Sequence, residues 1–237
     1  MRFQTPLVPA RLVRRWNRFL SEAALEATGE VVRAHCPNPG AMLGLKEPGT
    51  RIWLEGNDDP RRKLRWAWRL AELPGGHMAG IDTAVPNRVV AEALRARAVP
   101  RLAAYDTVRP EVRYGDRSRC DFLLTGPGLP DAWVEVKNVH LMRRPGLAEF
   151  PDCVTARGAR HLSDLTGRVA AGDRAVMFYL VQRTDCDRLA MAADLDPAYA
   201  AGLDRARAAG VEVICHDTAI DTGGVTLRHA LPLVAQG

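Results

Sequence analysis

The chain of 237 residues lacks the features that mark secreted, membrane-spanning and zinc-ribbon proteins. Its five cysteines are odd in number, widely spaced and without any Cys-x-x-Cys pair, which argues against a disulfide framework or a zinc ribbon and for reduced thiols. The sequence has no apolar signal region and no apolar run long enough to cross a bilayer. We therefore expect a cytoplasmic protein with neither a membrane partner nor a disulfide-linked partner.

Lysine is also scarce, since only Lys46, Lys63 and Lys137 occur among the 33 lysines and arginines. An arginine guanidinium is nearly always charged and is forked in shape, whereas a lysine amine is a compact charge whose pKa can shift. The lysine at position 137 therefore indicates a site that requires an amine.

The positive charge is unevenly distributed, although the net charge of +5 is only mildly basic. Residues 1–82 hold 13 basic and 9 acidic side chains, and residues 83–237 hold 20 and 19. A basic surface binds phosphate backbones because binding releases counterions. The first third is therefore a candidate nucleic-acid surface, and an arginine-rich solvated surface is the alternative.

Short strands dominate residues 1–82, which we expect to form an OB-fold-like barrel. The strands lie at Ser21–Ala27, Glu30–His35, Thr50–Glu55 and Arg62–Leu70, the last by alternation of apolar and basic residues. Four of the five tryptophans precede residue 70. Such barrels bind single strands by stacking bases on aromatic side chains in a basic groove, and the alternative is that the tryptophans form the core. The basic candidates for contact are Arg14, Arg15, Arg18, Lys63 and Arg65.

Residues 83–237 switch between helical and strand patterns, which predicts an α/β (α+β) domain with a mixed sheet. Three strands are expected between Arg109 and His140, followed by a long loop at Leu141–Gly158. The apolar run Ala175–Val181 is typical of a buried central strand. The other expected elements are the helices Arg88–Ala98, Arg157–Val169 and Pro197–Ala209 and the strand Val211–Cys215.

A hairpin of Cys120–Thr125 and Ala132–Val139 would gather charged residues on one face. If positions that sum to 256 are paired, Asp121 faces Glu135 at about 5 Å, and the two carboxylates repel. Lys137 projects from the same face, because strand side chains alternate. A bound divalent cation would remove the repulsion, and we expect this face to border a cleft. The alternative is an exposed strand with an ordinary alternating salt pair.

The order of elements, with an acid in the second strand and Glu-x-Lys in the third, resembles the PD-(D/E)XK nuclease superfamily. Further segments narrow the resemblance to the sugar fermentation stimulation protein A family of bacteria and archaea. They follow one another along nearly the whole chain: NRFLSEAAL, AHCPNPGAM, RKL, SRCDFLL, VEVKNVHL, FPDCVTARGARHL and DPAYAAGL with AGVEV. Departures are small: Pro39 replaces a common threonine, and Cys120 stands where the family commonly has an aliphatic residue and the superfamily a proline.

The resemblance implies a DNA-binding protein, with an N-terminal OB-fold joined to a nuclease-like domain, and a divalent-metal site. Asp121 and Glu135 would hold Mg²⁺ or Mn²⁺ with the backbone carbonyl of Val136. Lys137 would orient the attacking water or stabilise the transition state. Glu92 would be a further catalytic acid.

Three other residues are candidates on the same ground. Arg157 and His161 would grip a neighbouring phosphate, although His161 is equally consistent with a helix-surface residue. Glu111 is a weaker acidic candidate than Glu92.

Two classes of function stay open at this point. A metal-dependent nuclease acting on DNA, or on RNA, is favoured because degenerate members of the fold usually lose the acid or the lysine, and this chain keeps both. The alternative is a non-catalytic DNA-binding regulator of sugar (maltose) metabolism with a vestigial nuclease fold. A sugar-processing enzyme finds no sugar-binding or phosphate-loop motif here, and no pattern predicts an oligomeric state.

Overall fold

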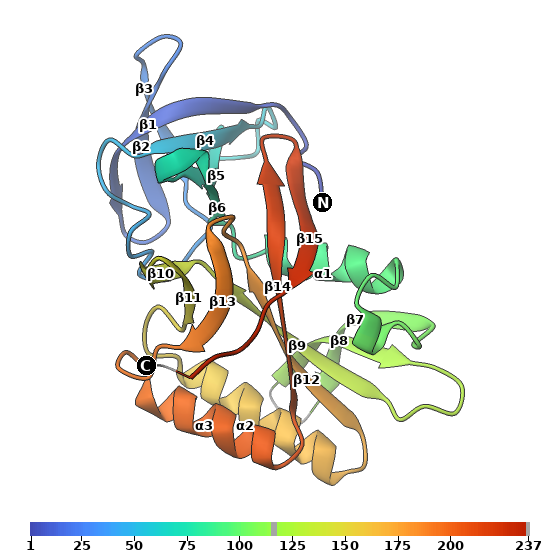
Figure 1. Ribbon diagram of the computed structural model, residues 1–237. Coiled ribbons are helices and arrows are strands. Elements are labelled where there is room, and N and C mark those ends of the chain that lie inside the picture. Colours follow the sequence, from blue (N-terminus) through green and yellow to red (C-terminus); the bar gives the residue numbers. More distant parts are fainter. Residues whose placement is uncertain (115–117, 236–237) are drawn as a thin grey trace.

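The N-terminal third forms a closed β-barrel in the computed structural model, which describes residues 1–114 and 118–235 (Figure 1). Its sheet has the strand order β3-β2-β1-β4-β5-β6, and a parallel pairing of β3 with β5 closes five strands into the barrel. This confirms the predicted OB-fold-like architecture. The strands are β1 (Leu7–Trp16), β2 (Leu20–Leu25), β3 (Val31–His35), β4 (Arg51–Gly56), β5 (Trp66–Glu72) and β6 (Met78–Gly80).

Alternation of buried and exposed residues builds the barrel core. In β3, Val32 and Ala34 are buried while their neighbours are exposed, as a half-buried strand requires. Trp68 is fully buried, and its indole Nε1 donates to the carbonyl of Leu70 at 2.9 Å. Trp68 therefore serves as core. The predicted strand Arg62–Leu70 begins late, at Trp66, because residues 57–65 form a loop closed by a backbone hydrogen bond.

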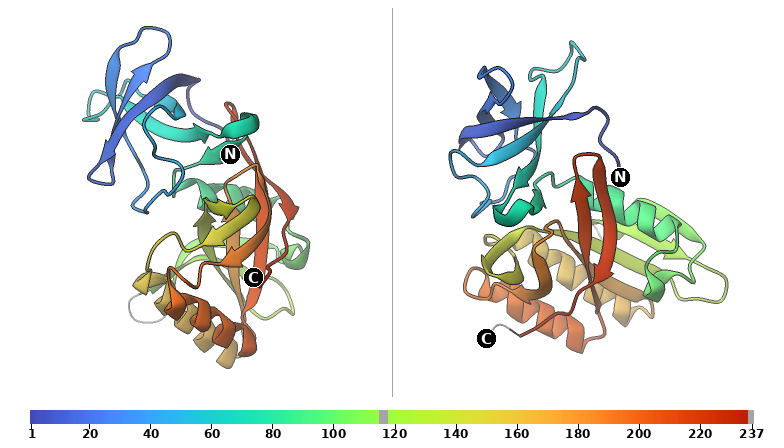
Figure 2. Two further views of the ribbon diagram at one scale, coloured as in Figure 1. Left: turned by 60° about the vertical axis from the view of Figure 1, so that its left-hand side comes forward. Right: turned by 45° about the horizontal axis from the view of Figure 1, so that its top comes forward.

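A six-stranded mixed sheet with the order β15-β14-β12-β9-β8-β7 forms the second region (Figure 2). The strand β12, apolar from Ala175 to Val181, lies inside it, parallel to both β9 and β14, as its sequence predicted. The strands are β7 (Thr107–Tyr114), β8 (Ser118–Thr125), β9 (Ala132–Val139), β12 (Arg174–Val181), β14 (Glu212–Asp221) and β15 (Gly224–Ala230). The helices are α1 (Val85–Arg95), α2 (Ala156–Ala170) and α3 (Pro197–Ala208), with two short 3₁₀ turns at Pro74–Gly76 and Pro100–Leu102.

The predicted loop Leu141–Gly158 is wrong, because it contains two short strands. They are β10 (Leu141–Arg144) and β11 (Gly146–Phe150), and β11 pairs in parallel with β13 (Cys186–Met191) in a small separate sheet. Strands of four or five residues leave little periodicity to detect, and β11 has its second partner about 40 positions away. The strands β13 and β15 were not predicted either.

Helices cover the two faces of the large sheet differently. The α1 helix packs on one face with Phe122, Val134 and Val136, while α2 and α3 pack on the other with Leu123 and Trp133. The strand β9 therefore has helices on both sides, and its charged residues lie between two layers. Among the helices of the described ranges, none combines the length and the apolar character needed to cross a bilayer.

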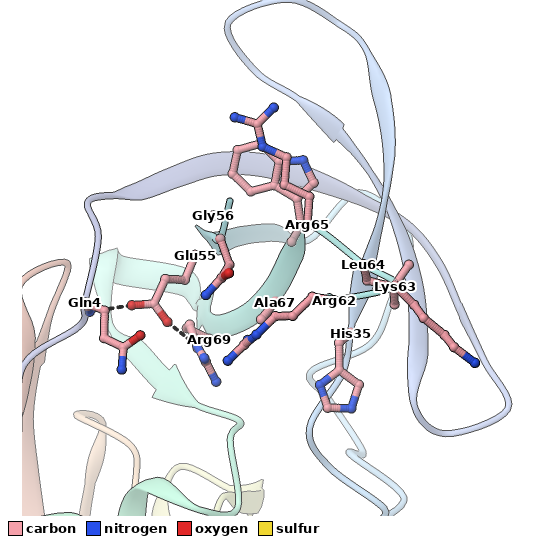
Figure 3. A pocket seen from close by; sticks show the side chains of 12 residues that line it. Gln4, His35, Glu55, Gly56, Arg62, Lys63, Leu64, Arg65, Ala67 and Arg69 are labelled. Atoms are coloured by element: carbon pink, nitrogen blue, oxygen red, sulfur yellow. Dashed lines mark hydrogen bonds and ion pairs between the residues drawn. The ribbon is translucent and has the colours of Figure 1, made fainter. Parts of the chain in front are cut away.

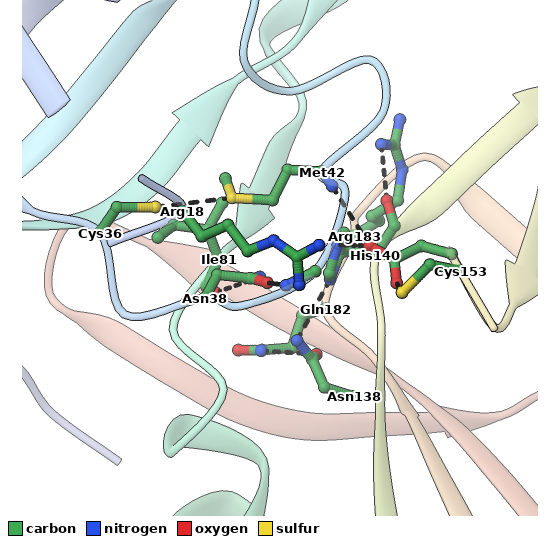
Figure 4. Close-up of polar contacts among 12 residues, drawn as sticks. Arg18, Cys36, Asn38, Met42, Ile81, Asn138, His140, Cys153, Gln182 and Arg183 are labelled. Atoms are coloured by element: carbon green, nitrogen blue, oxygen red, sulfur yellow. Dashed lines mark hydrogen bonds and ion pairs between the residues drawn. The ribbon is translucent and has the colours of Figure 1, made fainter. Parts of the chain in front are cut away.

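Polar groups at the seam between the barrel and the second region are densely bonded (Figure 4). Asn38, almost fully buried, donates to the carbonyl of Ile81 at 2.7 Å. Asp152 Oδ2 accepts from the Met42 amide at 3.2 Å and lies 3.4 Å from His140 Nε2. Burial by itself would raise the pKa of Asp152, but the contact and charge of His140 outweigh it and hold that pKa below its usual range.

We expect Asp152→Asn to lower the free energy of unfolding by about 1–3 kcal/mol at pH 7, because a charged acceptor at the seam is lost. A carboxylate with a depressed pKa stabilises the fold above its unfolded pKa of about 3.9, and this contribution disappears as the pH falls through the folded-state value. Urea titrations at pH 7 and near pH 3 should therefore show the difference shrinking in acid.

The matched control is Asp187→Asn, whose carboxylate is largely exposed and pairs with the neighbouring Arg188. It should change stability by less than about 0.5 kcal/mol. A deficit of Asp152→Asn that stays constant with pH would show that the negative charge does not stabilise the seam.

Candidate active site

The β8–β9 hairpin adopts the predicted register. Leu123 pairs with Trp133, and Phe122 with Val134, all at positions that sum to 256. The ladder ends there, one pair short of Asp121 and Glu135. Beyond that point a side chain replaces the backbone acceptor: the backbone N–H of Val136 donates to Asp121 Oδ2 at 2.7 Å.

An irregularity in β7 and β8 explains why Asp121 leaves the ladder. Glu111, the residue opposite, has a left-handed φ of 53°, and the ladder resumes only at Val112 and Cys120. Cys120 and Leu123 consequently pack on the α2 face, whereas Phe122 packs on the α1 face. The strand changes phase at position 121.

Asp121 opens onto a hollow of about 400 Å³ on the α1 side, the carboxylate hollow. Asn87, in the first turn of α1, lines it and donates from Nδ2 to Asp121 Oδ1 at 2.6 Å. Glu92 and Glu111 line the same hollow, so three predicted acids meet there. The Glu92 carboxylate is bound by the backbone nitrogen of Met1 at 2.5 Å.

Sequence reasoning missed Asn87. The available signal was its place beside Pro86 at a predicted helix start, since first-turn side chains of such a helix lie near the sheet it packs on.

The α2 helix covers the opposite face, where the sequence predicted a cleft beside Glu135 and Lys137. Glu135 is only 3% exposed, and its Oε1 accepts from Lys137 Nζ at 2.6 Å and contacts His161 Nδ1. Burial by itself would raise the pKa of Glu135, but the hydrogen bond from His161 and the charge of Lys137 outweigh it and lower that pKa.

Arg157 contacts His161, one helical turn away on α2. Its Nε donates to His161 Nε2 at 3.3 Å. His161 Nδ1 lies against Glu135 Oε1 and, at 3.2 Å, against Lys137 Nζ. The chain Arg157–His161–Glu135 orients one oxygen of the carboxylate.

The second oxygen of Glu135 is buried and has no hydrogen-bond partner among the described residues. Burial and the nearby negative charge of Glu135 raise the pKa of Asp121 to about 6. The backbone N–H and C=O of one strand residue point toward the same neighbour, so the Val136 carbonyl lies on the Asp121 side. Two carboxylates and one carbonyl therefore converge on one short stretch of β9.

No group of three or more His, Cys, Asp or Glu side chains in the described ranges is arranged to hold a metal ion. A cation here would have to rely on the two carboxylates, the carbonyl and water. That donor set suits Mg²⁺ or Mn²⁺, which keep several waters, better than a caged metal.

The predicted nucleic-acid contacts in β1 and its turn have different surroundings. Arg14 pairs with Glu22 at 2.7 Å, and Arg15 donates to the carbonyls of Arg18, Asn38 and Gly40. Arg18 is exposed. Arg14 and Arg15 are thus engaged within the protein, and their role toward nucleic acid stays a prediction.

Lys63 and Arg65 line a second hollow of about 270 Å³ on the barrel, the barrel hollow (Figure 3). Trp66 and His35 are also at its wall. Glu55 is the acidic residue at this wall. Its carboxylate accepts from Arg69 Nε at 2.8 Å and from the backbone N–H of Gln4 at 2.5 Å.

Two family descriptions match consecutive parts of the chain. Residues 13–81 match the "SfsA N-terminal OB domain", and residues 84–224 match the "Sugar fermentation stimulation protein RE domain".

Relatives match over nearly the full length. A sugar fermentation stimulation protein homolog of Dinoroseobacter shibae is 71% identical over 98% of this chain and 96% of its own. A homolog of Caulobacter vibrioides is 49% identical over 95% of this chain and 94% of its own length. The solved structure of Pyrococcus furiosus SfsA in complex with Ca²⁺ has a TM-score of 0.88 and 26% identity, and covers 99% of this chain and 98% of that one.

We expect Asp121→Asn to raise the free energy of unfolding of the metal-free protein by about 1–2 kcal/mol, as removing a strained functional charge often does. The amide oxygen keeps the bond from Val136, while the repulsion from Glu135 is removed. Urea unfolding in EDTA measures the change. The control Asp106→Asn removes an exposed carboxylate paired with Arg97 and should not stabilise. An Asp121→Asn protein less stable than wild type would mean that this carboxylate stabilises the hairpin.

Proposed function

The chain belongs to the sugar fermentation stimulation protein family, and from that membership we propose that it binds nucleic acid and hydrolyses phosphodiester bonds at a divalent-cation site. One observation carries the proposal: one oxygen of Glu135 is buried without a partner among the described residues, and the charge of Glu135 helps to raise the pKa of Asp121. Buried polar groups are normally satisfied, so such an atom calls for a missing partner. A cation between the two carboxylates would supply it.

Asp121, Glu135 and the Val136 carbonyl would hold the cation, which we propose is Mg²⁺ or Mn²⁺. All three donors are hard oxygens, as these ions prefer. The related Pyrococcus furiosus protein is described in complex with Ca²⁺, another cation of the same preference. When bound, the ion would acidify a water and neutralise charge on the scissile phosphate.

The remaining side chains have separate tasks in this proposal. Lys137, 13% exposed, holds its amine 2.6 Å from Glu135 and would place positive charge beside the reacting phosphate. His161 and Arg157 keep Glu135 in one orientation, so one oxygen stays available. The mixed domain would cut, and the basic barrel would hold the nucleic acid.

Mn²⁺ should raise the melting temperature of the wild type but not that of Asp121→Asn. A ligand that binds only the folded state stabilises it by about 2.7 kcal/mol at a hundredfold excess over Kd. Differential scanning fluorimetry over a Mn²⁺ titration measures the shift, with Asp106→Asn as the control that should respond like the wild type. Equal shifts in Asp121→Asn would remove this carboxylate from the cation site.

Glu135→Gln should lower hydrolysis by about a hundredfold or more, as expected when activation of water is lost. Binding of nucleic acid should change little, or tighten as repulsion of phosphate is relieved. The assay uses single- and double-stranded DNA and RNA with Mg²⁺ or Mn²⁺, and Glu47→Gln on an exposed barrel loop is the matched control.

Two results would redirect the proposal. If both proteins bind but neither cuts any substrate, the chain is a DNA-binding regulator with a vestigial nuclease fold. If both cut equally, the hydrolytic site lies elsewhere in the chain.

A further inference from the structure

Three hollows lie end to end between the barrel and the carboxylates. The barrel hollow shares Gln4, Glu55, Arg62 and Arg69 with a junction hollow of about 250 Å³, which these residues line together with Arg88. Arg88 in turn lines the carboxylate hollow, where Asp121 lies. Each hollow therefore borders the next through shared wall residues, from the barrel to the candidate active site.

Unpaired positive charges mark this path. Seven barrel arginines are held in ion pairs: Arg11, Arg14, Arg33, Arg51, Arg61, Arg65 and Arg69. Lys63, Arg62 and Arg88 are exposed, and none of them forms an ion pair with a described residue. Lys63 lines the first hollow, Arg62 the first and second, and Arg88 the second and third.

The acids along the path are already neutralised. Arg69 forms ion pairs with both Glu55 and Asp82. The backbone N–H of Gln4 adds a second bond to Glu55 (Figure 3). A passing phosphate therefore meets cations that form no ion pair with a described residue, although Arg62 feels the charge of Asp59, which Arg61 binds. It meets no free carboxylate in the walls of the first two hollows among the described residues.

We infer that a single strand of nucleic acid follows this path, with successive phosphates on Lys63, Arg62 and Arg88 and the scissile one near Asp121. This inference rests on the proposed function and adds the substrate's form and route. The three hollows have volumes of about 250–400 Å³, which lie near the low end of small-ligand pockets. Each hollow therefore suits a single nucleotide unit.

A duplex fits this route poorly, because it is stiff over about 150 base pairs and cannot dip into successive small hollows. Trp66, half-buried at the wall of the barrel hollow, carries the Arg65 guanidinium 5.6 Å from its ring centroid, and an unpaired base can stack on this pair. Both features favour a flexible strand with free bases.

The test measures binding by fluorescence anisotropy in EDTA, so that no cutting occurs. The probes are labelled thymidine strands of about 4 and about 16 nucleotides, the limits of OB-fold sites, a uridine strand of the longer length and a matching duplex. The full chain is compared with Arg62→Ala and Arg88→Ala. Controls are Arg61→Ala, whose side chain pairs with Asp59, and Arg97→Ala, which pairs with Asp106.

Each test variant should bind the long strand about three- to tenfold more weakly, and its slope of log K against log salt should be smaller by about 0.7. Arg88→Ala should leave the short strand unaffected, since that strand fills only the barrel hollow. The duplex should bind more weakly than the long strand, and the uridine strand shows whether RNA takes the same route.

Failure of the route differs from failure of the function. If the wild type binds nucleic acid but Arg62→Ala and Arg88→Ala match their controls, or the duplex binds best, the route is wrong and the proposed function stands. If the wild type binds none of the probes, both are wrong.

Discussion

The carboxylates of Asp121 and Glu135 set the main constraint on this structure. They come from adjoining strands, Glu135 is buried and Asp121 is half-buried, and burial together with the charge of Glu135 makes Asp121 harder to ionise. Such a pair destabilises a sheet unless charge or hydrogen bonds compensate it. The surroundings supply only part of the compensation: Lys137 and His161 contact one oxygen of Glu135, and no described residue contacts the other.

The phase change in β8 determines how the two carboxylates share the site. Had the ladder continued, both side chains would lie under α2, away from the hollows. The left-handed Glu111 ends the regular pairing, so that Asp121 turns to Asn87 and the α1 side while Glu135 stays under α2. Only the backbone of Val136 separates them, which makes its carbonyl a natural third donor. A non-glycine residue in this conformation costs free energy, and such strain gathers at functional sites.

Local pattern sufficed for the parts of the fold whose partners are near in sequence. The turn residues between β8 and β9 fixed their register, and the apolar run in β12 fixed its central place. The strands β10, β11 and β13 were not predicted because their runs are short and the pairing of β11 with β13 is long-range. The bend at Asp121 was not predicted either, because it depends on the backbone conformation of Glu111 in another strand. The seam contacts of Asp152 cross from one region to the other, and no periodicity encodes them.

Charge neutralisation ties the barrel to the carboxylate site. Glu55, Asp82 and Glu92 all have cationic partners, so Asp121 and Glu111 are the acids of the third hollow that form no ion pair with a described residue. A divalent ion at Asp121 and Glu135 would therefore reduce the repulsion in this hollow as well as complete the site. Linkage is reciprocal: if the bound ion raises the affinity for a strand that reaches Arg88, that strand raises the affinity for the ion by the same factor. A strand too short to leave the barrel hollow cannot show this coupling.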